Sequence, residues 1–151
     1  MIDVPTNNSP TDFAIVACSV AVNRPIDEAW REIGDFADAG RFLNVFSKLV
    51  SGIGQLGSVR LVGDAILEVM VGSSSHSYSY AQVRGPMAGF SYHGCLELSP
   101  LNSESCRLSY TLVYDQAPMD AARRTSEFER VSLRFKNAAQ AMKAAAETSR
   151  D

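Results

Sequence analysis

Apolar and polar residues alternate through most of the chain between residues 54 and 115, which is the pattern of half-buried β-strands. Five stretches of this kind are separated by short connections containing Gly, Ser or Pro: 54–62, 65–71, 75–83, 89–98 and 105–115. Two earlier stretches, 12–22 and 48–53, have the same strand character. Short connections are typical of hairpins, so the sequence predicts seven strands in an antiparallel meander.

Helical spacing replaces this alternation in three places. Residues 24–36 carry a proline at an opening turn, acidic residues in the first helical turn, and apolar residues three or four positions apart. Residues 37–46 repeat a weaker version of the pattern, so two short helices are predicted. Residues 121–146 lack Pro and Gly and predict a long amphipathic helix, whose apolar stripe contains Phe128, Val131, Phe135, Ala138 and Met142.

These elements predict an α+β fold in which a seven-stranded curved antiparallel sheet wraps around the long C-terminal helix. That helix is the only element large enough to cover the apolar face of the sheet. We expect one helix to fill such a sheet incompletely and to leave an internal cavity near the two short helices. Residues 1–11 are rich in Pro, Asn, Ser and Thr and predict a flexible lead-in, followed by a single domain over residues 12–148.

Composition excludes several functional classes. The 151 residues fit one domain, and the net charge of −3 with scattered basic residues argues against a nucleic-acid partner. No apolar stretch approaches the ~20 residues that span a bilayer, and no signal pattern opens the chain, so we expect a cytoplasmic protein without membrane insertion. Three cysteines and two histidines show no metal-ligand spacing, so neither a metal nor a cofactor is predicted. A monomer or a homodimer is expected.

Strand alternation identifies side chains that should face the helix, because residues two apart share one face of a strand. Bulky or aromatic residues occupy one face of three predicted strands: Tyr78 and Tyr80; Phe90, Tyr92, Leu96 and Leu98; and Leu108, Tyr110, Leu112 and Tyr114. Tyrosine rings offer flat apolar area, and their hydroxyls fix orientation, a combination that small-molecule pockets use. The same residues would also serve as ordinary core.

Glu68 is the acidic residue in the best position to carry chemistry. Both faces of its strand are apolar, so alternation does not fix the direction of its side chain. Inside a cavity, desolvation would raise its pKa and prepare it for proton transfer. Alternatively, Glu68 is held by a tyrosine or an arginine for structure, or turns to solvent. Arg60 and Arg134 are further candidates that could reach inward to an acidic ligand.

The order of strand, two short helices, six strands and long helix resembles the helix-grip fold of the START and birch-pollen-allergen (SRPBCC) superfamily. The stretches RPIDEAWREIGDF, GQLGSVRLV, LEVMV, SYSYAQVRGPMAGFSYHGCLEL and SYTLVYD are similar to its bacterial polyketide cyclase/dehydrase-like branch, and more distantly to plant abscisic-acid receptors. This resemblance covers about residues 19–147. It implies binding of a hydrophobic or aromatic molecule between sheet and helix, with Glu68 and Tyr92 pointing into the cavity and residues 84–89 at its mouth.

Three functions are compatible with these observations. The favoured one is binding of a small hydrophobic molecule, aromatic, polyketide-like or lipid-like. The residues expected to contact it are Glu68, Tyr78, Tyr80, Phe90, Tyr92, Leu108, Tyr110, Leu112, Phe128, Val131 and Phe135. The second is an enzyme of cyclase, dehydratase or aldol type, in which Glu68 acts as acid or base and Tyr92 or Tyr110 polarises a carbonyl. The third is an interaction protein without small-molecule turnover.

Overall fold

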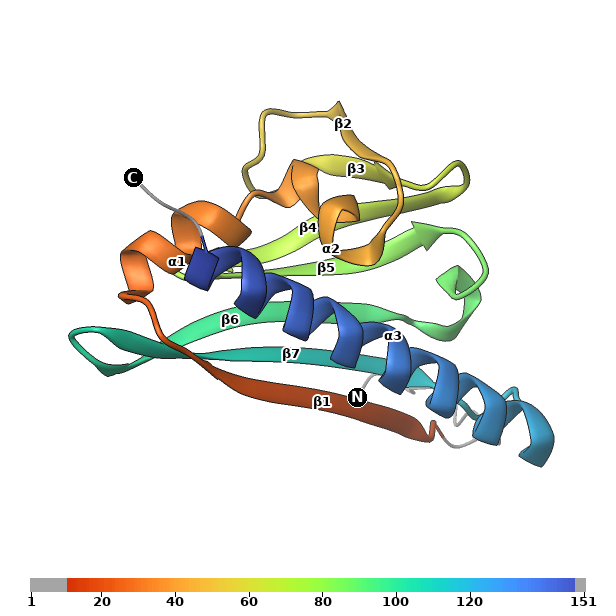
Figure 1. Ribbon diagram of the computed structural model, residues 1–151. Helices are drawn as coiled ribbons and strands as arrows, with labels where there is room; N and C mark the ends of the chain where they lie inside the picture. The colour runs from red at the N-terminus through yellow and green to blue at the C-terminus, as the bar shows by residue number, and fades with distance from the viewer. Residues whose placement is uncertain (1–10, 149–151) are drawn as a thin grey trace, which may run out of the picture.

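A computed structural model describes residues 11–148, so the predicted lead-in lies almost wholly outside the described residues. Seven strands and one long helix form the structure (Figure 1). In chain order the elements are β1 Phe13–Val22, α1 Ile26–Ile33, η1 Phe36–Asp38, α2 Gly40–Leu43, β2 Ser47–Ser51, β3 Val59–Val62, β4 Ile66–Ser74, β5 Ser77–Arg84, η2 Ala88–Phe90, β6 His93–Asn102, β7 Ser105–Asp115 and α3 Ala121–Thr148.

The strands form one antiparallel sheet in the order β1-β7-β6-β5-β4-β3-β2. Strands β2 to β7 follow one another as a meander, and β1 pairs with β7, with Val16 opposite Leu112. The chain crosses from β1 at one edge to β2 at the other through α1 and α2, and α3 lies across the same face of the sheet (Figure 1). The predicted helix-grip fold is confirmed.

The two short helices are smaller than the sequence pattern indicates. Pro25 precedes α1, and acidic residues occupy its first turn, where they complement the helix dipole. The second predicted helix is only a 3-10 turn followed by the four residues of α2. Asn44 ends α2 in the left-handed conformation, and the Ser47 hydroxyl accepts a hydrogen bond from the Gly40 N–H at 2.8 Å. These contacts anchor the start of β2.

The long helix packs on the sheet through a stripe of large and small apolar residues. Its buried residues are Val131, Phe135, Ala138, Ala139, Met142 and Ala146. The alanines allow the C-terminal half of α3 to approach the sheet closely. Phe128 does not belong to this stripe, contrary to the prediction, because 44% of it is exposed and the first turns of α3 project past the end of β1 (Figure 1).

One tyrosine of the inner sheet face packs against a glycine of the neighbouring strand. Tyr80 on β5 is paired with Gly94 on β6, and a Cβ atom at Gly94 would come within 2.3 Å of the Tyr80 ring. The Tyr80 hydroxyl lies 2.9 Å from the hydroxyl of Tyr110 on β7. Because both residues are fully buried, this hydrogen bond satisfies polar atoms that water does not reach. Gly94 therefore lets the Tyr80 ring lie across β6 toward β7.

Replacing Gly94 by alanine should displace the Tyr80 ring and strain its hydrogen bond with Tyr110. We expect Gly94→Ala to lower the free energy of unfolding by about 1–3 kcal/mol, the usual cost of overpacking a core. The control is Gly89→Ala, because Gly89 is exposed and an added Cβ would meet nothing within 4 Å. Urea denaturation measures both variants, and equal stabilities would contradict this account of the core.

Candidate functional site

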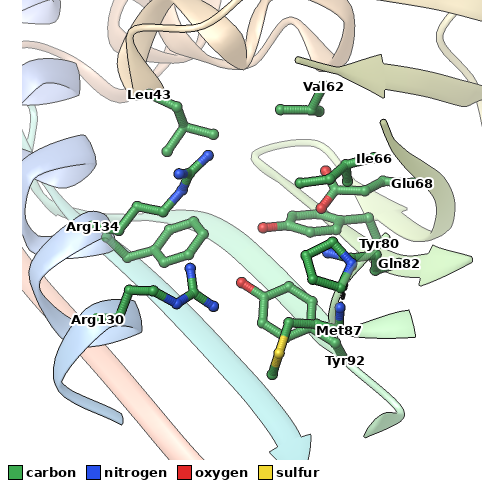
Figure 2. A pocket seen from close by; sticks show the side chains of 12 residues that line it. Leu43, Val62, Ile66, Glu68, Tyr80, Gln82, Met87, Tyr92, Arg130 and Arg134 are labelled. Atoms are coloured by element: carbon green, nitrogen blue, oxygen red, sulfur yellow. Dashed lines mark hydrogen bonds between the residues drawn. The ribbon is translucent and has the colours of Figure 1, made fainter. Parts of the chain in front are cut away.

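A small pocket lies between the inner face of the sheet and the N-terminal half of α3 (Figure 2). Its volume is about 60 Å³. It is lined by Leu43, Val62, Ile66, Glu68, Tyr80, Gln82, Pro86, Met87, Tyr92, Arg130, Arg134 and Phe135. The pocket therefore has an apolar wall, a carboxylate and tyrosines from the sheet, and two arginines from the helix.

A buried ion pair lies at the sheet side of this pocket. Arg60 on β3 is directly opposite Glu68 on β4, and both side chains point inward. The Arg60 Nε and Nη2 atoms each lie 2.9 Å from Glu68 Oε1. Only 1% of Arg60 and 6% of Glu68 is exposed. The Glu68 side chain, whose direction strand alternation does not determine, therefore points inward, and its partner is Arg60.

Aromatic rings and a carbonyl group surround the rest of the Arg60 guanidinium. Its Nη1 donates to the Phe36 carbonyl at 3.0 Å and to the Tyr78 hydroxyl at 3.2 Å. The guanidinium carbon lies 4.2 Å from the centre of the Phe36 ring and 4.4 Å from that of Tyr80. These contacts give a buried cation hydrogen bonds and cation–π contacts in place of water. Arg60 is thus a fixed part of the core.

Burial alters the acidity of the ionisable groups at the pocket. It raises the pKa of Glu68 above the usual carboxyl value, while Arg60 and, more weakly, Arg134 oppose this rise. Burial also raises the pKa of Tyr80 and Tyr92 well above that of a free phenol. Both phenols therefore stay protonated at neutral pH and can donate a hydrogen bond to a ligand or accept one from it.

The helix side of the pocket is cationic. Arg130 and Arg134 lie one turn apart on α3, and their side chains reach toward the tyrosines of the sheet (Figure 2). Arg130 donates through Nε and Nη2 to Glu127 Oε2, at 3.2 and 2.7 Å. Arg134 forms no hydrogen bond or ion pair with any residue in the described part of the chain. Its guanidinium therefore has donors available at the pocket.

The connection between β5 and β6 closes the remaining side. Gln82 Oε1 accepts the Met87 N–H at 2.8 Å, which holds this loop against the sheet, and Met87 is buried. Further along, the guanidinium of Arg123 lies 4.6 Å from the ring centre of Phe90 and links the loop to α3. Pro86 and Met87 line the pocket, so part of the segment predicted at the cavity mouth borders it.

The structure brings together only some of the predicted ligand-contacting residues. Four of them line the pocket: Glu68, Tyr80, Tyr92 and Phe135. Five others lie in the buried core outside its lining: Tyr78, Leu108, Tyr110, Leu112 and Val131. Phe90 belongs to η2, not to a strand, and packs under Arg123; Phe128 lies on the helix surface. Tyr110, a predicted catalytic residue, is bonded to Tyr80 within the core.

Other lining residues carry no clear signal in the sequence. Leu43 comes from the very short α2, and Val62 and Ile66 flank the tight turn between β3 and β4. Arg130 lies on the helix beyond the apolar stripe, where a solvated arginine is the usual expectation. Among these other lining residues, Gln82 is the one that strand alternation could have added to the predicted site, because it shares a face of β5 with Tyr78 and Tyr80.

The predicted internal cavity is much reduced because side chains fill the space between sheet and helix. The rings of Tyr110 and Phe135 are 4.8 Å apart, and the Tyr80 hydroxyl bonds to that of Tyr110. An apolar cavity of about 150 Å³ accommodates one benzene molecule. At about 60 Å³, the pocket has room for a few water molecules and takes an aromatic ligand only if its walls move.

Within residues 11–148, no group of three His, Cys, Asp or Glu side chains is arranged to hold a metal ion. The three cysteines are free, with Cys106 buried and the other two half-buried. No helix of the same residues is long and apolar enough to cross a membrane.

A wider surface groove of about 280 Å³ runs between β1 and α3, lined by residues that include Cys18 and Lys136.

The sequence profile of the family described as polyketide cyclase / dehydrase and lipid transport matches residues 14–147. The chain belongs to this family. The match covers nearly the whole of the sequence and confirms the resemblance inferred from its strand and helix motifs. No curated protein sequence matches the chain.

Solved structures share the fold of this polyketide cyclase/dehydrase family member at low sequence identity. A protein from Nitrosospira multiformis is 20% identical, with a TM-score of 0.74, over 90% of this chain and 97% of its own. The ZhuI aromatase/cyclase from a Streptomyces species is 16% identical, with a TM-score of 0.70, over 90% and 94%. Truncated norcoclaurine synthase from Thalictrum flavum is 13% identical, with a TM-score of 0.70, over 95% and 99%.

Removing one partner of the buried ion pair should destabilise the protein strongly. We expect Arg60→Ala to cost about 3–5 kcal/mol of unfolding free energy, because it leaves the Glu68 carboxylate buried without its partner. The double variant Arg60→Met/Glu68→Leu should recover most of this loss. Arg107→Ala, which removes an exposed arginine bonded to Ser19, is the control and should change stability by less than about 0.5 kcal/mol. A loss for Arg60→Ala no larger than for this control would contradict the role of the pair.

Alkaline titration tests the burial of the tyrosines. Burial raises the pKa of Tyr80, Tyr92 and Tyr110, so these phenols hold their protons in the folded state above pH ~10, where unfolded tyrosines ionise. The folded state then binds more protons than the unfolded state, so stability should fall as the pH rises past about 10. Absorbance at the tyrosinate band should show these three ionising only as circular dichroism reports unfolding. Ionisation of all five tyrosines in the folded protein would contradict the described core.

Proposed function

We propose that this protein binds a small hydrophobic molecule in the pocket between the sheet and α3. The observation that carries the proposal is the combination of apolar walls, from Leu43, Ile66 and Phe135, with a few fixed polar groups at Glu68 and Tyr92. Ligand sites of proteins commonly have this composition, since apolar surface supplies affinity and a small number of polar atoms fix orientation. The family description, which includes lipid transport, agrees with such a role.

A ligand larger than a few water molecules has to open the pocket on its helix side. Tyr80 and Tyr110 are locked by their mutual hydrogen bond and by complete burial. Arg130 and Arg134 are long, lie toward the mouth, and can swing away from the sheet by changing rotamers. We therefore expect the ligand to enter between α3 and the β5–β6 connection and to displace the arginine side chains.

Catalysis of the cyclase, dehydratase or aldol type is the second candidate. Its support is that Glu68, whose pKa is raised by burial, shares the pocket with the Tyr92 phenol. A carboxyl with a raised pKa can exchange a proton with a bound substrate. We prefer binding without turnover, because Arg60 holds Glu68 Oε1 with a hydrogen bond from Nε and an ion-pair contact from Nη2, and because Tyr110 lies outside the pocket lining.

Filling the pocket should abolish binding. Ile66→Trp places an indole against the apolar wall, whereas Val83→Trp makes a similar change at a residue of β5 that is 56% exposed. We expect native mass spectrometry of protein purified from its own host to show a retained small molecule in the wild type and in Val83→Trp, and to show none in Ile66→Trp. Circular dichroism confirms that each variant is folded.

Two results would overturn this proposal. One is equal retention of the molecule by folded Ile66→Trp. The other is an empty wild-type protein whose melting temperature does not change with any member of a panel of aromatic and lipid compounds. If a ligand is found, incubation with wild type and Glu68→Gln, followed by mass analysis, distinguishes carriage from turnover, because only the catalytic alternative predicts conversion by the wild type and its loss in the variant.

A further inference from the structure

The pocket carries more positive charge than its own residues neutralise. Arg60 forms an ion pair with the carboxylate of Glu68, and Glu127 forms one with Arg130. Arg134 faces the same space and has no ion-pair partner in the described part of the chain. One cationic charge is thus uncompensated at this pocket, although the whole protein has a net charge of −3.

This placement leaves Arg134 without a counter-ion beside a second arginine, which is itself paired with Glu127. Arg130 and Arg134 are four residues apart on α3, and like charges at this spacing destabilise a helix by a few tenths of a kcal/mol. Both residues nevertheless line the pocket and extend toward the sheet (Figure 2), Arg134 half-buried and Arg130 with 48% of its side chain exposed. An anionic group near them would neutralise the charge that Glu127 leaves uncompensated and would use the free N–H donors of Arg134.

We propose that Arg134, assisted by Arg130, binds the carboxylate of an otherwise apolar ligand. This inference rests on the proposed function, since it concerns the ligand of the same pocket. A guanidinium presents N–H groups in a planar fork that matches the two oxygens of a carboxylate, and such charge-assisted hydrogen bonds are among the strongest available to a protein. The apolar body of the ligand would then lie against Leu43, Ile66 and Phe135.

The position of Glu68 determines the orientation of this ligand. A ligand carboxylate at the sheet side of the pocket would meet the Glu68 carboxylate, and two anions in a buried site repel each other. The Arg60 guanidinium directs Nε and Nη2 to Glu68 and Nη1 to Phe36 and Tyr78, so it is already engaged. The ligand carboxylate therefore lies at the helix side and the mouth, and the uncharged part of the ligand points toward Glu68 and Tyr92.

Matched probes test this assignment. The anion 2-naphthoate and its uncharged analogue 2-naphthamide have the same ring system and differ in charge. We expect isothermal titration calorimetry to give wild-type protein about 10-fold or greater preference for 2-naphthoate. Arg134→Gln should remove most of this preference by weakening the binding of 2-naphthoate much more than that of 2-naphthamide. Lys136→Gln is the control, because it deletes the same charge from the same helix at a residue lining the groove near β1.

The possible outcomes separate this inference from the proposed function. Equal affinities for the two probes, or a preference that survives in Arg134→Gln, would overturn the carboxylate assignment while leaving the pocket as a ligand site. If Lys136→Gln loses the preference for 2-naphthoate to the same extent, the preference comes from the general charge of α3, and this result would also overturn the proposal. If neither probe binds to wild type at millimolar concentration, both this inference and the proposed site for ring-sized ligands are wrong.

Discussion

The rest of the structure depends on the buried contact between Arg60 and Glu68. It joins β3 to β4 on the inner face of the sheet and, through the Phe36 carbonyl, connects both strands to the segment after α1. Breaking it would leave a buried charge without its partner, a far larger cost than the loss of an exposed ion pair. Because Arg60 is also enclosed by the rings of Phe36 and Tyr80, the pair fixes the position of the aromatic residues beside the pocket.

A second consequence of this arrangement is the size of the pocket. The tyrosines that a spacious helix-grip cavity would expose to ligand instead bond and pack with one another, as Tyr80 does with Tyr110. What remains open lies between α3 and the β5–β6 connection, where Arg130, Arg134 and Met87 line the pocket. The sheet side of the pocket is rigid, whereas the side chains opposite it are adaptable. The size of ligand that can bind therefore depends on how far these adaptable side chains can move.

The sequence predicts the fold well because periodicity, turn residues and the long terminal helix all indicate the same architecture. Alternation also places Tyr92, Tyr110 and Leu112 on the inner face, as observed. The site is less predictable, because periodicity reports which face a residue occupies and not what fills the space in front of it. The partnership of Arg60 with Glu68 depends on the register between β3 and β4, and the exposure of Phe128 depends on where the sheet ends beneath α3. Neither is encoded in local pattern.

A crystal structure of the protein with its retained small molecule tests the central claim most directly. The account predicts density for the molecule between α3 and strands β4 and β5, with the guanidinium of Arg134 moved toward it and the Arg60–Glu68 contact intact. Density confined to the groove beside Cys18, or a ligand cavity opened by separating Arg60 from Glu68, would contradict it.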